Sequence, residues 1–269
     1  MVSFWTTCLT IAFATLVAAG GSKGAGKSCR LSVINSGEAA GQIKNVNGVQ
    51  VYHSYPPHRN YDHNSTKAVL FVTDFYGIAS LNNKLVADSI ARAGYPVIMP
   101  DLFNGDPVST ALAEGPALDL AAWRARHPTF AIDRIIESTI TYIRNGLSAS
   151  KLGAVGYCLG GKHVPRAMAA GGGIDVGFIA HPANLTAEEI RAIAGPISIA
   201  AGELDALFNS TGRRAAEDIL TARNATYQTN LYSGAPHGFA VRANLNISRQ
   251  RFAKEASFLQ AVTWFDNWL

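Results

Sequence analysis

The sequence predicts an α/β protein with a mostly parallel central sheet, helices on both faces and an antiparallel hairpin at its N-terminal end. The first observation is an alternation of short apolar runs with helix-compatible segments from about residue 67 to the C-terminus of the 269-residue chain. Such alternation builds parallel sheets that are covered on both faces. The second observation is the stretch Gly156-Tyr-Cys158-Leu-Gly160-Gly161. It indicates a buried strand that passes into a helix through a turn too tight for bulky side chains near Cys158.

Each expected element has a local reason. Asn47-Gly48 supplies the positive φ angles of a two-residue turn, which predicts a hairpin over 42–46 and 49–55. The run 67–73 is continuously apolar, as in a strand buried on both faces. Helix 80–93 has apolar residues at helical spacing and stops at Gly94. Further strands are expected at 95–99, 152–157, 176–180, 197–201 and 226–231, and further helices at 117–126, 129–145, about 159–170, 209–223 and 249–269. With the turn at Cys158, this order predicts an α/β-hydrolase fold.

The N-terminal region predicts secretion. Residues 1–19 carry no charged side chain, and their apolar run ends in small residues, as at a signal-peptidase site. We expect cleavage near Ala19 or Gly20, a flexible leader over 20–41 and a single domain over 42–269. A membrane anchor, the alternative, requires a longer apolar stretch. The mature protein is therefore expected to be extracellular, without membrane contact.

Glycosylation sequons support this interpretation. They begin at Asn64, Asn184, Asn209, Asn224 and Asn246. Loss of the signal peptide would leave two cysteines, Cys29 and Cys158. Because a disulfide between them would block the proposed nucleophile, we expect Cys29 to be free or paired with another molecule.

Composition argues against several classes of partner. The formal net charge is +4, with Lys and Arg dispersed along the chain rather than gathered in basic runs. This pattern does not predict nucleic-acid binding. No cluster of residues has metal-ligand spacing, so neither a metal nor an organic cofactor is expected. We expect a monomer or a weak dimer.

Three residues carry the expected chemistry. Cys158 would lie at the carboxyl end of a strand, beneath a helix N-terminus that favours a thiolate. Asp205 follows the strand 197–201, and His237 follows the next strand, in the order nucleophile, acid, histidine that this fold uses. Glu203 lies nearer the strand end and is expected to serve structure. Five of the six other histidines are weighed against His237. His181 could line the site or cap a loop, His163 should point away from Cys158, and His53, His58 and His63 are expected to face solvent.

The chain resembles the dienelactone hydrolase family. The resemblance rests on Thr73-Asp-Phe-Tyr-Gly77, Gly94-Tyr-Pro-Val-Ile-Met-Pro100-Asp101-Leu-Phe, Gly156-Tyr-Cys158-Leu-Gly-Gly161, Gly202-Glu-Leu-Asp205 and His237-Gly-Phe239, in collinear order from about residue 42. It implies a Cys158-His237-Asp205 triad. The family places a glutamate beside the cysteine to hold the resting thiol, and Asp74 occupies the matching position here, one methylene shorter.

The resemblance also suggests the rest of the site. The oxyanion hole would consist of the backbone N–H groups of Phe75 and Leu159. Arg242 would bind a substrate carboxylate, although the family's matching arginine lies one residue closer to its histidine; an exposed loop arginine is the alternative. Tyr76, Phe239, Phe103 and Trp123 could form the pocket wall or belong to the core.

These observations predict a secreted hydrolase of carboxylic esters or lactones that works through an acyl-enzyme on Cys158. The natural substrate is left open. An acyltransferase or peptidase with the same triad is one alternative. A secreted binding protein that has lost catalysis is another, and Asp74 in place of glutamate is what keeps it open.

Overall fold

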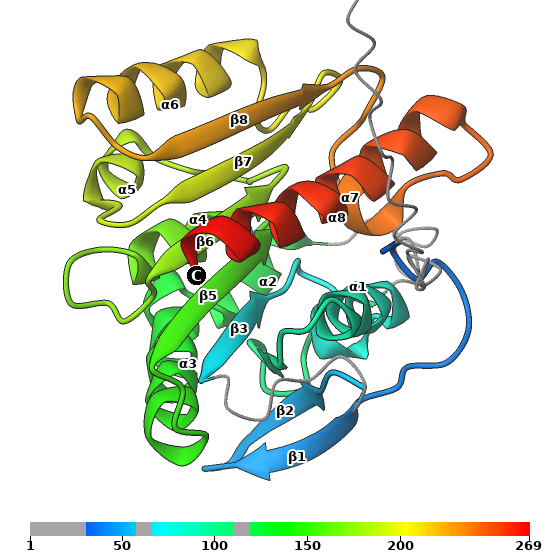
Figure 1. Ribbon diagram of the computed structural model, residues 1–269, viewed down its shortest axis with the longest axis vertical. Helices are drawn as coiled ribbons and strands as arrows, with labels where there is room; N and C mark the ends of the chain where they lie inside the picture. The colour runs from blue at the N-terminus through cyan, green and yellow to red at the C-terminus, as the bar shows by residue number, and fades with distance from the viewer. Residues whose placement is uncertain (1–30, 58–65, 110–118) are drawn as a thin grey trace, which may run out of the picture. The chain divides into compact units, whose positions relative to one another are not determined.

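Figure 1 shows the computed structural model, which describes residues 31–57, 66–109 and 119–269. The part Leu31–Leu269 forms one compact unit. The predicted signal peptide, Cys29, Asn64, His58 and His63 lie outside the described residues.

The described residues form one eight-stranded sheet in the order β1-β2-β4-β3-β5-β6-β7-β8. All neighbours from β4 to β8 pair in parallel, whereas β1 and β2 form an antiparallel hairpin that joins the sheet antiparallel to β4. The strands are β1 (Gln42–Val46), β2 (Val49–Ser54), β3 (Lys67–Val72), β4 (Val97–Pro100), β5 (Lys151–Tyr157), β6 (Val176–Ala180), β7 (Ile197–Gly202) and β8 (Tyr227–Tyr232). The predicted α/β-hydrolase architecture with its N-terminal hairpin is confirmed.

Helices cover both faces of the sheet, and α8 runs across β5 and β6 in Figure 1. One face packs against α1 (Leu81–Arg92), α7 (Phe239–Arg242) and α8 (Ser248–Trp268). The other packs against α2 (Leu120–Arg126), α3 (Thr129–Thr141), α4 (Gly160–Ala167), α5 (Ala187–Ala192) and α6 (Ser210–Ala222). Alternate residues of β3 serve the two layers: Val69 and Phe71 face the first, Leu70 and Val72 the second.

The predicted leader boundary at residue 41 is wrong, because the compact unit already begins at Leu31. Val33 is buried, and its N–H donates to the Glu255 carboxylate on α8. The N–H of Ala40 donates to Asp88 of α1 at 2.8 Å. These backbone groups find partners in helices far along the chain, and composition alone does not reveal such contacts.

Two short α-helices, α5 and α7, are present that the sequence patterns above do not predict. α5 begins with a capping box, in which Thr186 and Glu189 exchange side-chain and backbone hydrogen bonds. The Thr-x-x-Glu pattern in the sequence is typical of the start of a helix and could have predicted this one. α7 is only one turn long and follows Gly238, which has φ 85°. A further difference is that the predicted helix 129–145 ends in a π-helical turn, Tyr142–Gly146.

Candidate active site

The turn after β5 has the geometry of a nucleophile elbow. Cys158 sits between β5 and α4 with φ 53°, in the left-handed region that non-glycine residues rarely adopt. A Cβ on Gly156 would collide with the Gly160 carbonyl, and a Cβ on Gly160 would collide with the Val72 carbonyl. Both glycines are therefore required by close backbone approach, as the sequence predicts.

Backbone hydrogen bonds hold the elbow on both sides. The Cys158 N–H donates to the Ala180 carbonyl at 3.3 Å, and the Cys158 carbonyl accepts from the Ala183 N–H at 3.0 Å. The Gly160 N–H donates to the Thr73 carbonyl at 3.1 Å. The neighbouring strands β3 and β6 thus fix the position of the sulfur atom, which stabilises the strained φ of Cys158.

Burial favours the thiol form of Cys158, whereas the helix N-terminus was expected to favour a thiolate and the family resemblance implied a resting thiol. Cys158 is a free cysteine with 2% of its surface exposed. Burial raises its pKa to about 12, and the Asp74 carboxylate adds to the rise. The Arg242 guanidinium and the Leu159 N–H oppose this effect without cancelling it. Desolvation of the anion thus outweighs the helix N-terminus on which the prediction relied.

His237 and Asp205 lie in contact. Nδ1 of His237 is 3.0 Å from Oδ1 and 2.9 Å from Oδ2 of the buried Asp205 carboxylate. Asp205 Oδ1 also accepts from the N–H groups of Leu207 at 2.9 Å and Phe208 at 3.3 Å. A proton on Nδ1 satisfies this contact and leaves Nε2 as the free base. Nε2 is buried and has no hydrogen-bond partner among the described residues, the Cys158 sulfur included.

Asp74 pairs with Arg242. Asp74 follows β3 and is fully buried, and its Oδ2 accepts from Arg242 of α7. Its Oδ1 accepts from Asn83 Nδ2 at 2.9 Å and from the Tyr76 N–H at 3.1 Å. Burial raises the pKa of the Asp74 carboxyl, while Arg242 and the two N–H donors act against the rise. The Arg242 guanidinium also lies over the Tyr76 ring, 4.8 Å from its centroid. The structure thus joins two residues that were predicted separately.

The backbone N–H groups of Phe75 and Leu159, which are the predicted oxyanion-hole donors, have different surroundings. Within the described residues, the Phe75 N–H donates to no backbone or side-chain acceptor. The Leu159 N–H points to the thiol of Cys158. The Phe75 carbonyl accepts from the Val108 N–H at 2.9 Å, so the loop after β4 holds this peptide in place.

The predicted aromatic wall is mostly core. Phe239 is fully buried and packs against the rings of His181 and Tyr232 at 5.5 and 5.4 Å. Phe103 and Trp123 are also buried, and their ring centroids are 4.9 Å apart. Tyr76, which stacks under Arg242, is the aromatic residue most directly tied to the site.

Three of the other described histidines, which were weighed against His237, have different environments. His163 points away from Cys158, as expected, and its Nδ1 lies 2.7 Å from Asp133. His53 was expected to face solvent, which is wrong: it is buried on β2, with Nδ1 3.1 Å from the Tyr55 hydroxyl. His181 lies inside the site, and its ring centroid is 5.1 Å from that of His237.

Other predicted residues are accounted for as follows. Glu203 is structural, because it accepts from Ser233 and from the Gly234 N–H. The described sequon residues Asn184, Asn209, Asn224 and Asn246 are all exposed. No group of three or more metal-binding side chains is arranged to hold an ion in the described ranges. None of the helices built from those ranges has the length and apolarity needed to cross a membrane.

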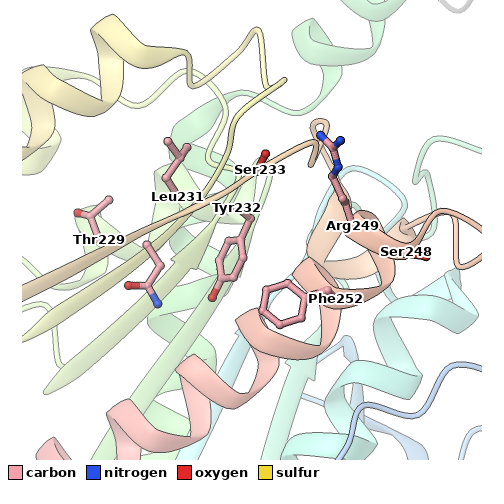
Figure 2. A pocket seen from close by; sticks show the side chains of 8 residues that line it. Thr229, Leu231, Tyr232, Ser233, Ser248, Arg249 and Phe252 are labelled. Atoms are coloured by element: carbon pink, nitrogen blue, oxygen red, sulfur yellow. The ribbon is translucent and has the colours of Figure 1, made fainter.

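A groove of about 680 Å³ lies away from these residues. It runs between β8 and the first turns of α8, where Figure 2 shows Tyr232 facing Phe252 and Arg249 lying near Ser233. Its lining includes neither Cys158 nor His237. This groove and the residues of the candidate active site are thus in different places.

The fold and the elbow together define an α/β hydrolase. Residues 50–269 match the dienelactone hydrolase family, and the chain belongs to that family of carboxylic-ester hydrolases.

Relatives support the assignment. The chain is 43% identical over 236 residues to "Hydrolase pyvD" of Aspergillus violaceofuscus, covering 88% of this chain and 94% of the relative. It is 30% identical to "Dienlactone hydrolase 1" of Gibberella moniliformis, covering 92% and 95%. A putative dienelactone hydrolase from Klebsiella pneumoniae shares the fold, with a TM-score of 0.67, 18% identity and coverage of 82% and 93%.

Proposed function

We propose that the protein hydrolyses ester or lactone bonds through Cys158, His237 and Asp205, with an acyl-enzyme intermediate. The main support for this proposal is the contact between His237 and the buried Asp205 carboxylate. This contact occupies Nδ1 of His237 and leaves its Nε2 available as a base in the region of the nucleophile elbow. His181 connects His237 with the elbow, because its ring contacts the ring of His237 and the nearby residues Ala180 and Ala183 form backbone hydrogen bonds with Cys158.

In the proposed acylation, Nε2 of His237 takes the proton of the Cys158 thiol as the sulfur attacks the substrate carbonyl. Asp205 stabilises the imidazolium that forms. The N–H groups of Phe75 and Leu159 bind the developing oxyanion. His237 then gives its proton to the departing oxygen. Deacylation repeats these steps with water, which His237 deprotonates, and the sulfur leaves and regains its proton.

Asp74 and Arg242 form the proposed gate. In the resting state the Asp74 carboxylate raises the pKa of the thiol. A substrate carboxylate that binds Arg242 removes the counter-ion of Asp74. Burial then favours the neutral carboxylic acid. Once Asp74 has taken up a proton from solvent water, its negative charge no longer opposes the Cys158 thiolate that forms when His237 removes the thiol proton, so a carboxylate-bearing substrate would activate its own nucleophile.

The test is turnover of p-nitrophenyl acetate and of dienelactone by the wild type and by Cys158→Ala. Loss of the sulfur removes the bond-forming atom, so activity should fall at least about 10³-fold. Trapping of an acyl group on Cys158 by mass spectrometry would identify the intermediate. Activity that survives Cys158→Ala would refute the mechanism. Transfer to amines in preference to water would instead indicate an acyltransferase.

We further propose that the protein is secreted and glycosylated. Support comes from the signal-like residues 1–19 and from the exposure of the described sequon residues. Recovery of the full chain from the culture medium of a eukaryotic host, followed by peptide N-glycosidase treatment, tests both points. Retention inside the cell, or an unchanged mass after treatment, would contradict them.

A further inference from the structure

A second histidine lies within the site and takes no part in the mechanism above. His181 directly follows β6, in the two-residue stretch between Ala180 and Ala183, the two residues whose backbone groups bond to Cys158. Its ring packs edge to face against His237, with centroids 5.1 Å apart and planes at 72°. The imidazole is therefore placed between the nucleophile elbow and the general base.

The nitrogens of this ring have no hydrogen-bond partner in the part of the chain that the structure describes. His181 is 0% exposed. One ring nitrogen is near the residue's own backbone, yet neither Nδ1 nor Nε2 has a hydrogen-bond partner among the described residues. A buried polar group left without a partner is costly, and such groups concentrate where function requires them. The neighbouring Nε2 of His237 is in the same situation.

Packing alone does not explain the choice of histidine. A phenylalanine would fill the same space against His237 and Phe239 without an unpaired nitrogen. The left-handed φ of 39° favours Asn, Asp or His, but those side chains usually satisfy themselves by local hydrogen bonds. His181 makes no such bond. The ring nitrogens therefore point to a partner that arrives with the substrate.

The charge state limits what that partner can be. Burial lowers the pKa of His181 well below its usual value, and a positive charge on His237 during the reaction or on Arg242 acts in the same direction. The ring is therefore neutral, with one nitrogen that donates and one that accepts. A neutral imidazole is suited to a hydroxyl or keto oxygen rather than to a carboxylate, for which Arg242 is the available cation.

We infer that His181 is a substrate-binding residue that hydrogen-bonds to a hydroxyl or keto oxygen on the acyl part of the substrate, close to the scissile carbonyl. The preferred substrates are then oxygenated esters or lactones rather than plain alkyl esters. This inference depends on the proposed ester hydrolysis. The His237 side chain is 20% exposed and its ring centroid lies 5.1 Å from that of the buried His181 ring, so a substrate that reaches the base arrives beside His181.

The experiment compares p-nitrophenyl butyrate with p-nitrophenyl 2-hydroxybutyrate and 3-hydroxybutyrate, which share a leaving group. His181→Phe should lower kcat/KM for the better hydroxylated ester about tenfold or more, because one substrate hydrogen bond is lost. The ratio of kcat/KM for that ester to kcat/KM for butyrate should fall by a similar factor, because butyrate has no oxygen for His181 to bind. His181→Asn tolerates the left-handed backbone and keeps a donor and an acceptor, so it should retain part of the preference.

The outcomes separate the two proposals. Equal losses on all three esters in both folded variants would mean that His181 only shapes the elbow, and would overturn the inference. So would a wild-type preference that both variants preserve, or a wild type that does not favour either hydroxylated ester. If His181→Phe does not fold, the comparison of His181→Asn with the wild type decides the question. No turnover of any ester by the wild type would instead refute the proposed hydrolysis.

Discussion

Among the described residues, two histidine–aspartate pairs are partly buried, and only one of them lies in the candidate site. In the first, His237 contacts Asp205, whose Oδ1 is otherwise held by backbone N–H groups. In the second, His163 of α4 contacts Asp133 of α3 at 2.7 Å, and Arg166 donates to both carboxylate oxygens of Asp133. Both histidines have a buried Nε2 without a partner among the described residues.

The two pairs differ in whether an arginine neutralises the aspartate and in which groups lie next to the histidine. Asp205 has no arginine partner in the described part of the chain, so its charge is available to stabilise an imidazolium. The charge of Asp133 is shared with the Arg166 guanidinium, whereas the ring of His237 packs against His181, whose neighbours in the chain bond to Cys158. A histidine–aspartate contact is therefore not sufficient for a catalytic site; the counter-ion of the carboxylate and the neighbouring nucleophile decide its role.

The largest contrast is expected from matched histidine substitutions. His237→Gln should lower kcat/KM for p-nitrophenyl acetate about 10³-fold or more, because the general base is lost. His163→Gln should leave kcat/KM within about threefold while lowering stability by about 1–3 kcal/mol, since a buried hydrogen bond is broken. Esterase kinetics and thermal melting measure the two effects. If folded His163→Gln lost as much activity as His237→Gln, the conclusion that only the His237–Asp205 pair is catalytic would be contradicted.

An intermediate effect is expected on the reactivity of the thiol. Asp74→Asn removes a negative charge beside Cys158 and leaves Arg242 unpaired, and both changes favour the thiolate. The pKa of Cys158 should therefore fall below its wild-type value of about 12. The pH dependence of iodoacetamide alkylation, followed by mass spectrometry, measures the shift. Asp133→Asn is the matched control and should not move the profile; an unchanged profile in Asp74→Asn would rule out the proposed gate.

The smallest effect concerns acid stability. Burial raises the pKa of Asp133, but hydrogen bonds from His163 and Arg166 outweigh it, and the net pKa is lowered. A carboxyl with a depressed folded-state pKa contributes stability above its unfolded pKa, and this contribution is lost as pH falls through the folded value. Wild type should thus lose stability below about pH 4.

Asp133→Asn cannot titrate and should show a shallower loss over that range. The expected difference is about 1 kcal/mol or less, because the Arg166 side chain is 38% exposed and screened by solvent. Urea unfolding between about pH 3 and 6 provides the measurement. Parallel stability curves for the two proteins would show that this pair has no net electrostatic effect on folding.

Much of the architecture was determined by signals that are local in the chain. Alternating apolar runs predicted the parallel strands, Asn47-Gly48 predicted the hairpin turn, and the glycines around Cys158 predicted the elbow. Each signal works because it reflects the backbone freedom or the burial of the residues that carry it. The order of Cys158, Asp205 and His237 then followed from the placement of functional residues at the carboxyl ends of strands.

The tertiary structure alone decided the electrostatics and the enclosure of the site. Asp74 and Arg242 are separated by 168 residues in the chain, so no local pattern could reveal their ion pair. Burial keeps Cys158 as a thiol and His181 neutral, although their sequence neighbours suggest a helix-stabilised thiolate and a loop residue. Desolvation depends on every layer packed around a group. The protonation state of this site is therefore a property of the folded molecule, whereas the position of its nucleophile is already determined by the sequence.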